Sequence, residues 1–234
     1  MGIIVSARHM IGRCVRKAKR ICSPINAAEL RLEPISRSFG MDRGTPIDRF
    51  YIEAFLRENR RYITGDVLEM GESKYTDLFG QKHRAMKFLY GSQTGGTVVG
   101  GDLADLEGLP RGVADCFILT QTLSFIFSCD RALMGVRRVL KPGGVVLATV
   151  AGISQVSRYD ADRWGDYWRF TRQSVQRLFC RDFCDVRLRV YGNLASATAL
   201  LQGLAVEDLD EPAILNSADE DYPVIIGAIA RAGE

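Results

Sequence analysis

The chain has 234 residues, which is enough for one α/β domain with a short extension. A hydrophobic fraction of 47% and a charged fraction of 25% are ordinary for a soluble globular protein, and a net charge of +3 is too small to imply a nucleic-acid partner. No window approaches the ~20 apolar residues that a membrane-spanning helix needs, so we expect no membrane partner.

Residues 1–44 are predicted to form an N-terminal basic helix and lid segment, separate from a domain at 45–234. Within residues 8–22, basic side chains alternate with apolar ones at helical spacing, which is typical of a basic amphipathic helix. Two interpretations stay open: a lid or docking arm, and the solvated face of a packed helix. The basic residues follow the short apolar run at 3–5, whereas a secretory signal would begin with them, so we expect a cytoplasmic protein.

The six cysteines are scattered and form no C-x-x-C pair. Cys180 and Cys184 can share a helix face, but two thiols without a nearby His or further Cys make a poor metal site. The sequence therefore predicts buried free thiols in a reducing compartment, and no metal site.

A first helix of the main domain is predicted from the string Thr45-Pro46-Ile47-Asp48, with Thr45 as the N-cap and Pro46 at the first helical position. This helix runs to about Asn59. Short apolar strands then alternate with helices, and we place the strands at 66–70, 85–90, 97–101, 115–120 and 144–150. A helix near 130–140 is predicted to end at a tight reversal formed by Lys141-Pro142-Gly143-Gly144.

The C-terminal part differs from the preceding alternation. Residues 186–191 and 223–230 are two further strand candidates, separated by a helical stretch around 194–209. Alternating strands and helices imply a parallel sheet with right-handed crossovers, to which this hairpin-like pair is added. The predicted fold is a Rossmann-like α/β sheet, mostly parallel with an antiparallel C-terminal strand and with helices on both faces.

The exit of the first strand is a candidate ligand site, because a nucleotide-like ligand binds at the first strand-to-helix turn of such a sheet. Gly71 lets the backbone approach a ligand there, but the G-x-G-x-G run of dinucleotide-binding turns is missing. This disfavours a nicotinamide-dependent reductase. The acidic Glu69 and Glu72 suit a cationic sulfonium ligand, although Glu72 can equally be a solvated loop charge.

Two later strands bring polar residues to the same edge of the sheet. The third strand ends in Gly101-Asp102-Leu103, where a carboxylate can accept a hydrogen bond from the exocyclic amine of an adenine. The fourth strand is followed by Gln121.

The order of Glu69-x-Gly71, Gly101-Asp102, Asp115 with Gln121, and Leu140-Lys141-Pro142-Gly143-Gly144 resembles the class I S-adenosylmethionine-dependent methyltransferases. A subgroup is more similar still: methyltransferase domains associated with glycosyltransferases and with glycan or natural-product pathways. The strings that carry this resemblance are 39–49, Tyr75-Thr76 with Phe79-Gly80, 120–123, 152–157 and 164–171. It extends from about residue 34 to 230.

The resemblance implies S-adenosylmethionine as the cofactor. Glu69 and Gly71 would then line its methionine and ribose end, Asp102 and Leu103 would lie at the adenine and Gln121 near the sulfonium, with Glu72 and Tyr75 as further cofactor-binding residues. One departure concerns the second strand, which such families end with an acidic residue that binds the ribose hydroxyls. Here Lys87 stands about where that acid is expected.

The resemblance further implies methyl transfer to an oxygen of a sugar or a glycosylated small molecule. A sugar hydroxyl needs a base, and Asp166 is the first candidate because apolar neighbours would raise its pKa; Asp160 and Asp162 follow. Trp164, Tyr167, Trp168 and Arg169 are predicted to contact the substrate, with Arg43 available for an anionic group. Alternatively, the tryptophans pack over the sheet and Asp166 caps a helix.

A second function also stays open. Lys87 and the sparse glycine loop favour a methyltransferase-fold binding or scaffold protein that has lost or altered its catalysis. For the enzyme, the expected partner is a small-molecule substrate. A homodimer remains an open alternative to a monomer.

Overall fold

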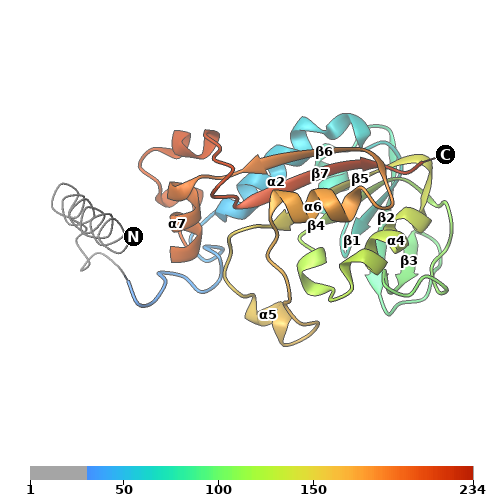
Figure 1. Cartoon of the computed structure of the whole chain (residues 1–234), viewed down its shortest axis with the longest axis horizontal. Helices are drawn as coiled ribbons and strands as arrows, with labels where there is room; N and C mark the ends of the chain where they lie inside the picture. The colour runs from blue at the N-terminus through green and yellow to red at the C-terminus, as the bar shows by residue number, and fades with distance from the viewer. Residues whose placement is uncertain (1–30, 234) are drawn as a thin grey trace, which may run out of the picture. The chain divides into compact units, whose positions relative to one another are not determined.

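The computed structural model describes residues 31–233 (Figure 1). The predicted basic helix at 8–22, and with it Cys14 and Cys22, lies outside the described residues. The chain divides into two units, residues 1–34 and 35–234, and every helix and strand named below belongs to the second.

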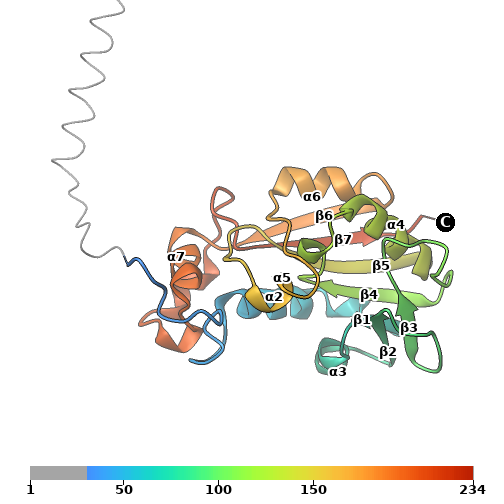
Figure 2. The ribbon, with the colours of Figure 1, turned by 90° about the horizontal axis from the view of Figure 1, so that it is seen from below.

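One seven-stranded sheet forms the centre of the second unit, with the strand order β3-β2-β1-β4-β5-β7-β6 (Figures 1 and 2). Neighbouring strands are parallel except at β7, which is antiparallel to both β5 and β6. The predicted fold class is thereby confirmed. The strands are β1 (Gly65–Met70), β2 (His83–Tyr90), β3 (Val98–Gly101), β4 (Ala114–Thr120), β5 (Leu140–Ala151), β6 (Cys184–Tyr191) and β7 (Ile225–Arg231).

Helices cover both faces of the sheet. They are α2 (Ile47–Glu58), α3 (Lys74–Phe79), α4 (Cys129–Val139), α5 (Arg158–Ala161), α6 (Arg172–Phe179) and α7 (Leu194–Gln202), with short 3-10 turns at Arg60–Tyr62, Leu123–Phe125, Val206–Asp208 and Pro212–Asn216. Helices α4 and α6 pack in one hydrophobic core, whereas α2, α3 and α7 pack in the other. None of the helices described is long and apolar enough to cross a membrane.

Strand β4 shows why the central sequence is apolar without interruption. Phe117 and Leu119 belong to the core under α4 and α6, while Cys116 and Ile118 belong to the core under α2 and α7. Because successive side chains of a strand point to opposite faces, a strand covered on both sides needs apolar residues at every position.

The start of α2 differs from the prediction. The helix begins at Ile47 with Pro46 at the N-cap position, so Thr45 is not the N-cap. Its hydroxyl donates instead to Oε1 of Glu207 at 2.8 Å, and its backbone N–H donates to Oε2 at 2.7 Å. The Thr45 hydroxyl, predicted to cap the helix, is therefore bound by the carboxylate of Glu207 from a distant segment of the chain.

The Lys141–Gly144 string also lies differently from its prediction as a reversal between helix and strand. It lies inside β5, where the pairing with β4 shifts register and Gly143 adopts φ +74°. Lys141 Nζ lies 2.7 Å from Oδ2 of Asp66 and 2.8 Å from Oδ2 of Asp115. This bulge therefore joins the amino-terminal ends of three neighbouring strands through one ammonium group.

The described cysteines are all free thiols. Cys116 and Cys129 are buried as predicted, and burial raises the pKa of the Cys129 thiol to about 11. Cys180 and Cys184 are exposed, so the prediction of burial is wrong for these two, which lie at the end of α6 and the start of β6.

Candidate active site

A cleft of about 710 Å³ opens at the carboxyl ends of β1, β4 and β5, a volume within the range of about 300–1,000 Å³ that small-molecule sites occupy. The exits of these strands contribute the segment 69–72, Thr120, Gln121 and Ala151. The remaining walls come from residues between 37 and 52 and between 154 and 169, together with Lys74, Tyr75, Ser124 and Phe125. The protein's own side chains therefore leave this edge of the sheet open to a ligand.

Gly71 lies directly after β1 and lines the cleft as predicted. Its φ of +79° is in the left-handed region that favours glycine. A Cβ built at this position would meet no atom within 4 Å, so the space above the backbone is free. A ligand can approach the main chain closely at this turn.

Glu69 also lines the cleft, but the fold already uses both of its carboxylate oxygens. Oε1 accepts the N–H of Tyr75 at 3.0 Å, and Oε2 accepts the N–H and the hydroxyl of Thr76, both at 2.7 Å. Glu69 is only 3% exposed. Burial raises the pKa of its carboxyl, and this effect outweighs the opposing effect of the hydrogen bonds. Glu69 thus anchors the first turn of α3 and holds Tyr75 at the cleft.

Gln121 and Ser124 present unpartnered polar atoms where the chain leaves β4. The Nε2 of Gln121 and the Oγ of Ser124 are buried and have no hydrogen-bond partner among the described residues. Gln121 also adopts φ +51°, an uncommon conformation for a residue other than glycine. Buried donors are normally satisfied, so these two atoms mark a place where a bound molecule would complete the hydrogen bonding. Of the two, sequence reasoning found only Gln121.

The end of β2 corrects the prediction for Lys87. The strand ends at Tyr90, in agreement with its predicted span of 85–90, so Lys87 lies three residues before the end, in register with Glu69, and does not line the cleft. Tyr90 takes the terminal position, 64% exposed, with its ring edge-to-face against Trp164 at 6.2 Å. The strand end still carries no carboxylate, but an aromatic ring replaces it rather than a cation.

Asp102 and Leu103 follow β3 and do not line the cleft. Asp102 Oδ1 accepts the N–H of Ala104 at 2.8 Å, and Leu103 is 2% exposed within the core beside α4. A contact of either residue with an adenine stays a prediction.

Asp166 forms an ion pair at the cleft in which both of its carboxylate oxygens accept hydrogen bonds from Arg169. Its side chain, 1% exposed, accepts Arg169 Nη1 at 2.6 Å, Arg169 Nη2 at 2.9 Å and the N–H of Ser157 at 2.9 Å. Burial acts to raise the pKa of Asp166, but the hydrogen bonds from Arg169 and Ser157 act more strongly and lower it. The expected rise is therefore wrong, because the sequence showed the aromatic neighbours and not the arginine fork. A carboxylate with both oxygens bound is poorly placed to accept a proton.

The two other predicted bases lie apart. Asp160 lines the cleft, with Oδ2 accepting the Ser157 hydroxyl at 2.6 Å and Oδ1 accepting Trp164 Nε1 at 3.3 Å. Asp162 is exposed and does not line the cleft.

The predicted aromatic contacts form an exposed ridge outside the cleft lining. Tyr167 and Trp168 pack against Phe127 with ring centroids 5.5 and 5.7 Å apart, and Trp164 packs against Tyr90. Their contact with a substrate stays a prediction. We call the five side chains Tyr90, Phe127, Trp164, Tyr167 and Trp168 the aromatic ridge.

The predicted substrate arginines separate in the structure. Arg169 lines the cleft and, besides binding Asp166, donates to the carbonyls of Ser154 and Gln155, so it holds the loop that leads into α5. Arg43 lies outside the lining, in a bidentate pair with Asp208 at 2.7 and 2.6 Å. Arg43 is therefore a structural residue that binds Asp208, and it does not face the cleft.

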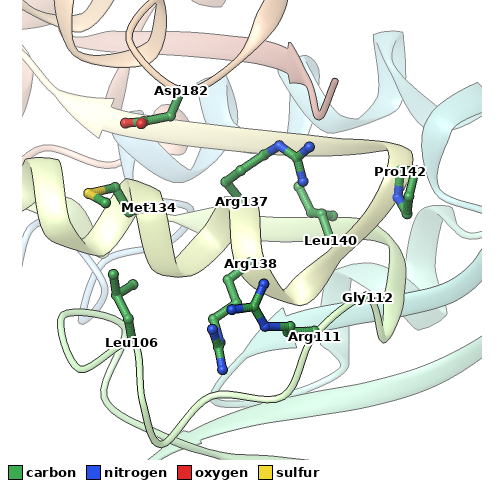
Figure 3. A pocket seen from close by; sticks show the side chains of 9 residues that line it. All are labelled: Leu106, Arg111, Gly112, Met134, Arg137, Arg138, Leu140, Pro142 and Asp182. Atoms are coloured by element: carbon green, nitrogen blue, oxygen red, sulfur yellow. The ribbon is translucent and has the colours of Figure 1, made fainter. Parts of the chain in front are cut away.

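A second pocket, of about 440 Å³, lies near the opposite ends of the strands, where β4 and β5 begin (Figure 3). Three arginines line it, and we call it the basic pocket. Arg137 Nη2 donates to the carbonyl of Gly233 at 2.7 Å, and Arg138 Nε donates to the carbonyl of Leu109 at 2.8 Å. The third is Arg111.

Comparison with known proteins agrees with this architecture. Residues 73–148, from the start of α3 into β5, match the family model described as a methyltransferase domain. A comparison with curated proteins found no match. The resemblance to class I methyltransferases is thus supported for this central segment.

Solved structures match this chain at low sequence identity. The N-methyltransferase NodS from Bradyrhizobium japonicum, in complex with S-adenosyl-L-homocysteine, matches with a TM-score of 0.52 and 12% identity over 86% of this chain and 94% of its own. An S-adenosylmethionine-dependent methyltransferase from Mesorhizobium loti matches with a TM-score of 0.49 and 15% identity over 82% and 100%. The NodS match shows a common fold.

Proposed function

We propose that this chain is an S-adenosylmethionine-dependent methyltransferase that methylates an oxygen of a sugar or of a glycosylated small molecule. The observation that carries the proposal is the pair of unpartnered buried atoms, Gln121 Nε2 and Ser124 Oγ, in the same cleft as the open backbone of Gly71. The fold and the methyltransferase-domain match support it.

The residues of the cleft suit the adenosyl cofactor. Gln121 and Ser124 offer donors to its polar groups, while Gly71 leaves room for close approach to the backbone. The exposed Glu72 adds negative charge near the same turn, which favours a sulfonium. S-adenosylmethionine supplies a methyl group that its positive sulfur has already activated. The protein's contribution is then to orient the acceptor and to exclude water.

The acceptor assignment rests on the aromatic ridge and on the resemblance to glycan-associated methyltransferase domains. Aromatic faces suit the C–H side of a sugar ring. The ridge is exposed and flanks the loop that carries Asp160 and Asp166 into the cleft.

A thermal-shift titration with S-adenosylmethionine, S-adenosylhomocysteine and NAD tests the cofactor. A ligand at 100 times its Kd stabilises the folded state by about 2.7 kcal/mol, so we expect a clear upward shift with both adenosyl ligands and none with NAD. Transfer of a labelled methyl group to a panel of glycosides and nucleotide sugars then tests the acceptor. Stabilisation by NAD alone would overturn the proposal.

The second candidate is a scaffold protein that keeps the fold without the chemistry. Its supporting observation is the end of β2, where Tyr90 stands without a carboxylate for the ribose hydroxyls. Binding of S-adenosylhomocysteine without methylation of any acceptor would favour this reading. If the missing acid matters, Tyr90→Asp, at the end of β2, should bind the adenosyl ligand more tightly than wild type, while Lys87→Asp, three residues before that end, should bind it equally.

A further inference from the structure

The proposed function requires a base, because an acceptor hydroxyl must lose its proton as its oxygen is methylated. The acidic residues that line the cleft differ in how far the fold already uses their oxygens. Glu69, Asp160 and Asp166 each have both oxygens in hydrogen bonds with the protein. Glu72 is exposed on the loop after β1, where water solvates it.

Asp48 is the remaining carboxylate of the lining, and its situation differs from these four. It is the second residue of α2 and is partly buried. Oδ1 accepts the backbone N–H of Arg49 at 2.7 Å. Oδ2 accepts no hydrogen bond from any other described residue, and it is not among the buried polar atoms that lack a partner. One oxygen of a partly desolvated carboxylate is therefore available in the cleft.

Neighbouring charges leave Asp48 without a neutralising partner. Arg49, on the same helix, donates through Nη1 to the Tyr75 hydroxyl at 3.4 Å and forms no ion pair with Asp48. Burial raises the pKa of Asp48, and this outweighs the opposing effect of Arg49. The other titratable groups that line the cleft are Arg37 before α2, Glu69, Glu72, Lys74 and Tyr75 from the β1–α3 side, Arg158, Tyr159 and Asp160 from α5, and Asp166 and Arg169 after it.

We propose that Asp48 is the catalytic base and that its Oδ2 accepts the proton of the acceptor hydroxyl. The acceptor oxygen forms the new bond to the methyl carbon as the carbon–sulfur bond breaks and leaves its electron pair on sulfur. The proton ends on Asp48 and passes to solvent when the product leaves. Asp166, held by Arg169, then positions the loop across the cleft and takes no proton.

The first test compares wild type with Asp48→Asn, which keeps an oxygen for the Arg49 N–H but cannot accept a proton. We expect the kcat for labelled methyl transfer to fall by about 10²–10⁴-fold, with the Kd for S-adenosylhomocysteine unchanged. The rate of wild type should rise with pH as Asp48 ionises, and that rise should be absent in Asp48→Asn. Glu53→Gln is the matched control, because Glu53 lies on the same helix outside the cleft lining, and it should keep wild-type activity.

The second test needs no acceptor. A carboxyl whose pKa is raised in the folded protein adds stability below its unfolded pKa of about 3.8, and this stability is lost as pH rises through the folded pKa. The melting temperature of Asp48→Asn should therefore increase relative to that of wild type as pH rises above about 4. A purely structural role at the helix start predicts the reverse, since removing a negative charge from the first turn weakens a helix.

The outcomes separate this inference from the proposed function. If wild type neither binds S-adenosylhomocysteine nor transfers a methyl group, the proposed function fails and the role of Asp48 falls with it. If wild type is active and Asp48→Asn stays within about threefold of it, only the base assignment is overturned. Loss of activity together with lower stability at every pH also overturns it and leaves Asp48 a structural residue.

Discussion

The cleft and the basic pocket lie near opposite ends of the strands, and they differ in what their polar groups do. In the basic pocket, whose lining Figure 3 shows, Arg137 and Arg138 donate to the main-chain carbonyls of Gly233 and Leu109 and so hold the segment after β7 and the loop before β4. In the cleft, Gln121 and Ser124 keep buried atoms without partners. Buried polar atoms are costly unless they are paired, so a folded chain tolerates unpaired ones mainly where a ligand binds. The basic pocket has an unpaired buried atom too, Oδ2 of Asp182, so the cleft differs from it by combining such atoms with the open backbone of Gly71 at the carboxyl ends of the strands.

The largest expected effect is a difference in the free energy of unfolding between variants of two arginines, Arg169 at the cleft and Arg137 at the basic pocket. Arg169→Ala leaves the buried carboxylate of Asp166 without its partner, which should lower the free energy of unfolding by about 3–5 kcal/mol. Arg137→Ala removes a hydrogen bond to a carbonyl and should cost about 1 kcal/mol. Urea unfolding of both variants measures the gap, and equal losses would contradict the assignment of Asp166 as the anchor of the loop.

Two glycines sharpen the same comparison, because both have positive φ but only Gly71 lies in the cleft. Gly71→Leu and Gly112→Leu, at φ +79° and +61°, should each lose about 1–2 kcal/mol of stability through left-handed strain. Only Gly71→Leu should weaken binding of S-adenosylhomocysteine, by more than about 100-fold, because its side chain fills the space that a ligand needs. Calorimetric titration of both variants checks this. A similar loss of affinity in Gly112→Leu would show that fold damage is the cause.

Removal of an unpartnered cleft atom should have two smaller effects of opposite sign, one on the stability of the free protein and one on ligand binding. Ser124→Ala takes away a buried hydroxyl that has no partner, so the free protein should be as stable as wild type or slightly more stable. Binding of S-adenosylhomocysteine should weaken by about 1 kcal/mol, roughly fivefold, if the hydroxyl donates to the ligand. Thermal shifts with and without the ligand separate the two effects, and unchanged binding would remove Ser124 from the site.

The smallest effect is expected at the amino-terminal ends of the strands. Hydrogen bonds from Arg84 and Lys141 lower the pKa of Asp66 to about 2 from an ordinary value of 3.8. A lowered pKa adds stability above about pH 4 that is lost as pH falls through about 2. Asp66→Asn should therefore be slightly less stable than wild type at pH 7, with the difference shrinking below pH 4. Acid titration of both proteins by circular dichroism tests this, and a pH-independent difference would contradict it.

The sequence by itself determined the fold, because β4 and the other core strands carry apolar runs whose length and spacing leave few alternatives to a covered parallel sheet. It also located the turn at Gly71 and the residue after β4, Gln121, since both follow directly from where a strand ends. Strand ends are local properties of a chain.

Tertiary structure alone decided the state of each functional group. Asp166 and Asp48 are both aspartates near aromatic residues in the sequence, yet Arg169 holds the first ionised while burial without a neutralising partner raises the pKa of the second. The pairing of β2 with β1 set Lys87 beside Glu69 and outside the cleft lining, and the distant Asp208 paired Arg43. Hydrogen bonding, desolvation and ion pairing depend on which side chains come into contact in the folded protein. The spacing of residues along the chain does not specify those contacts.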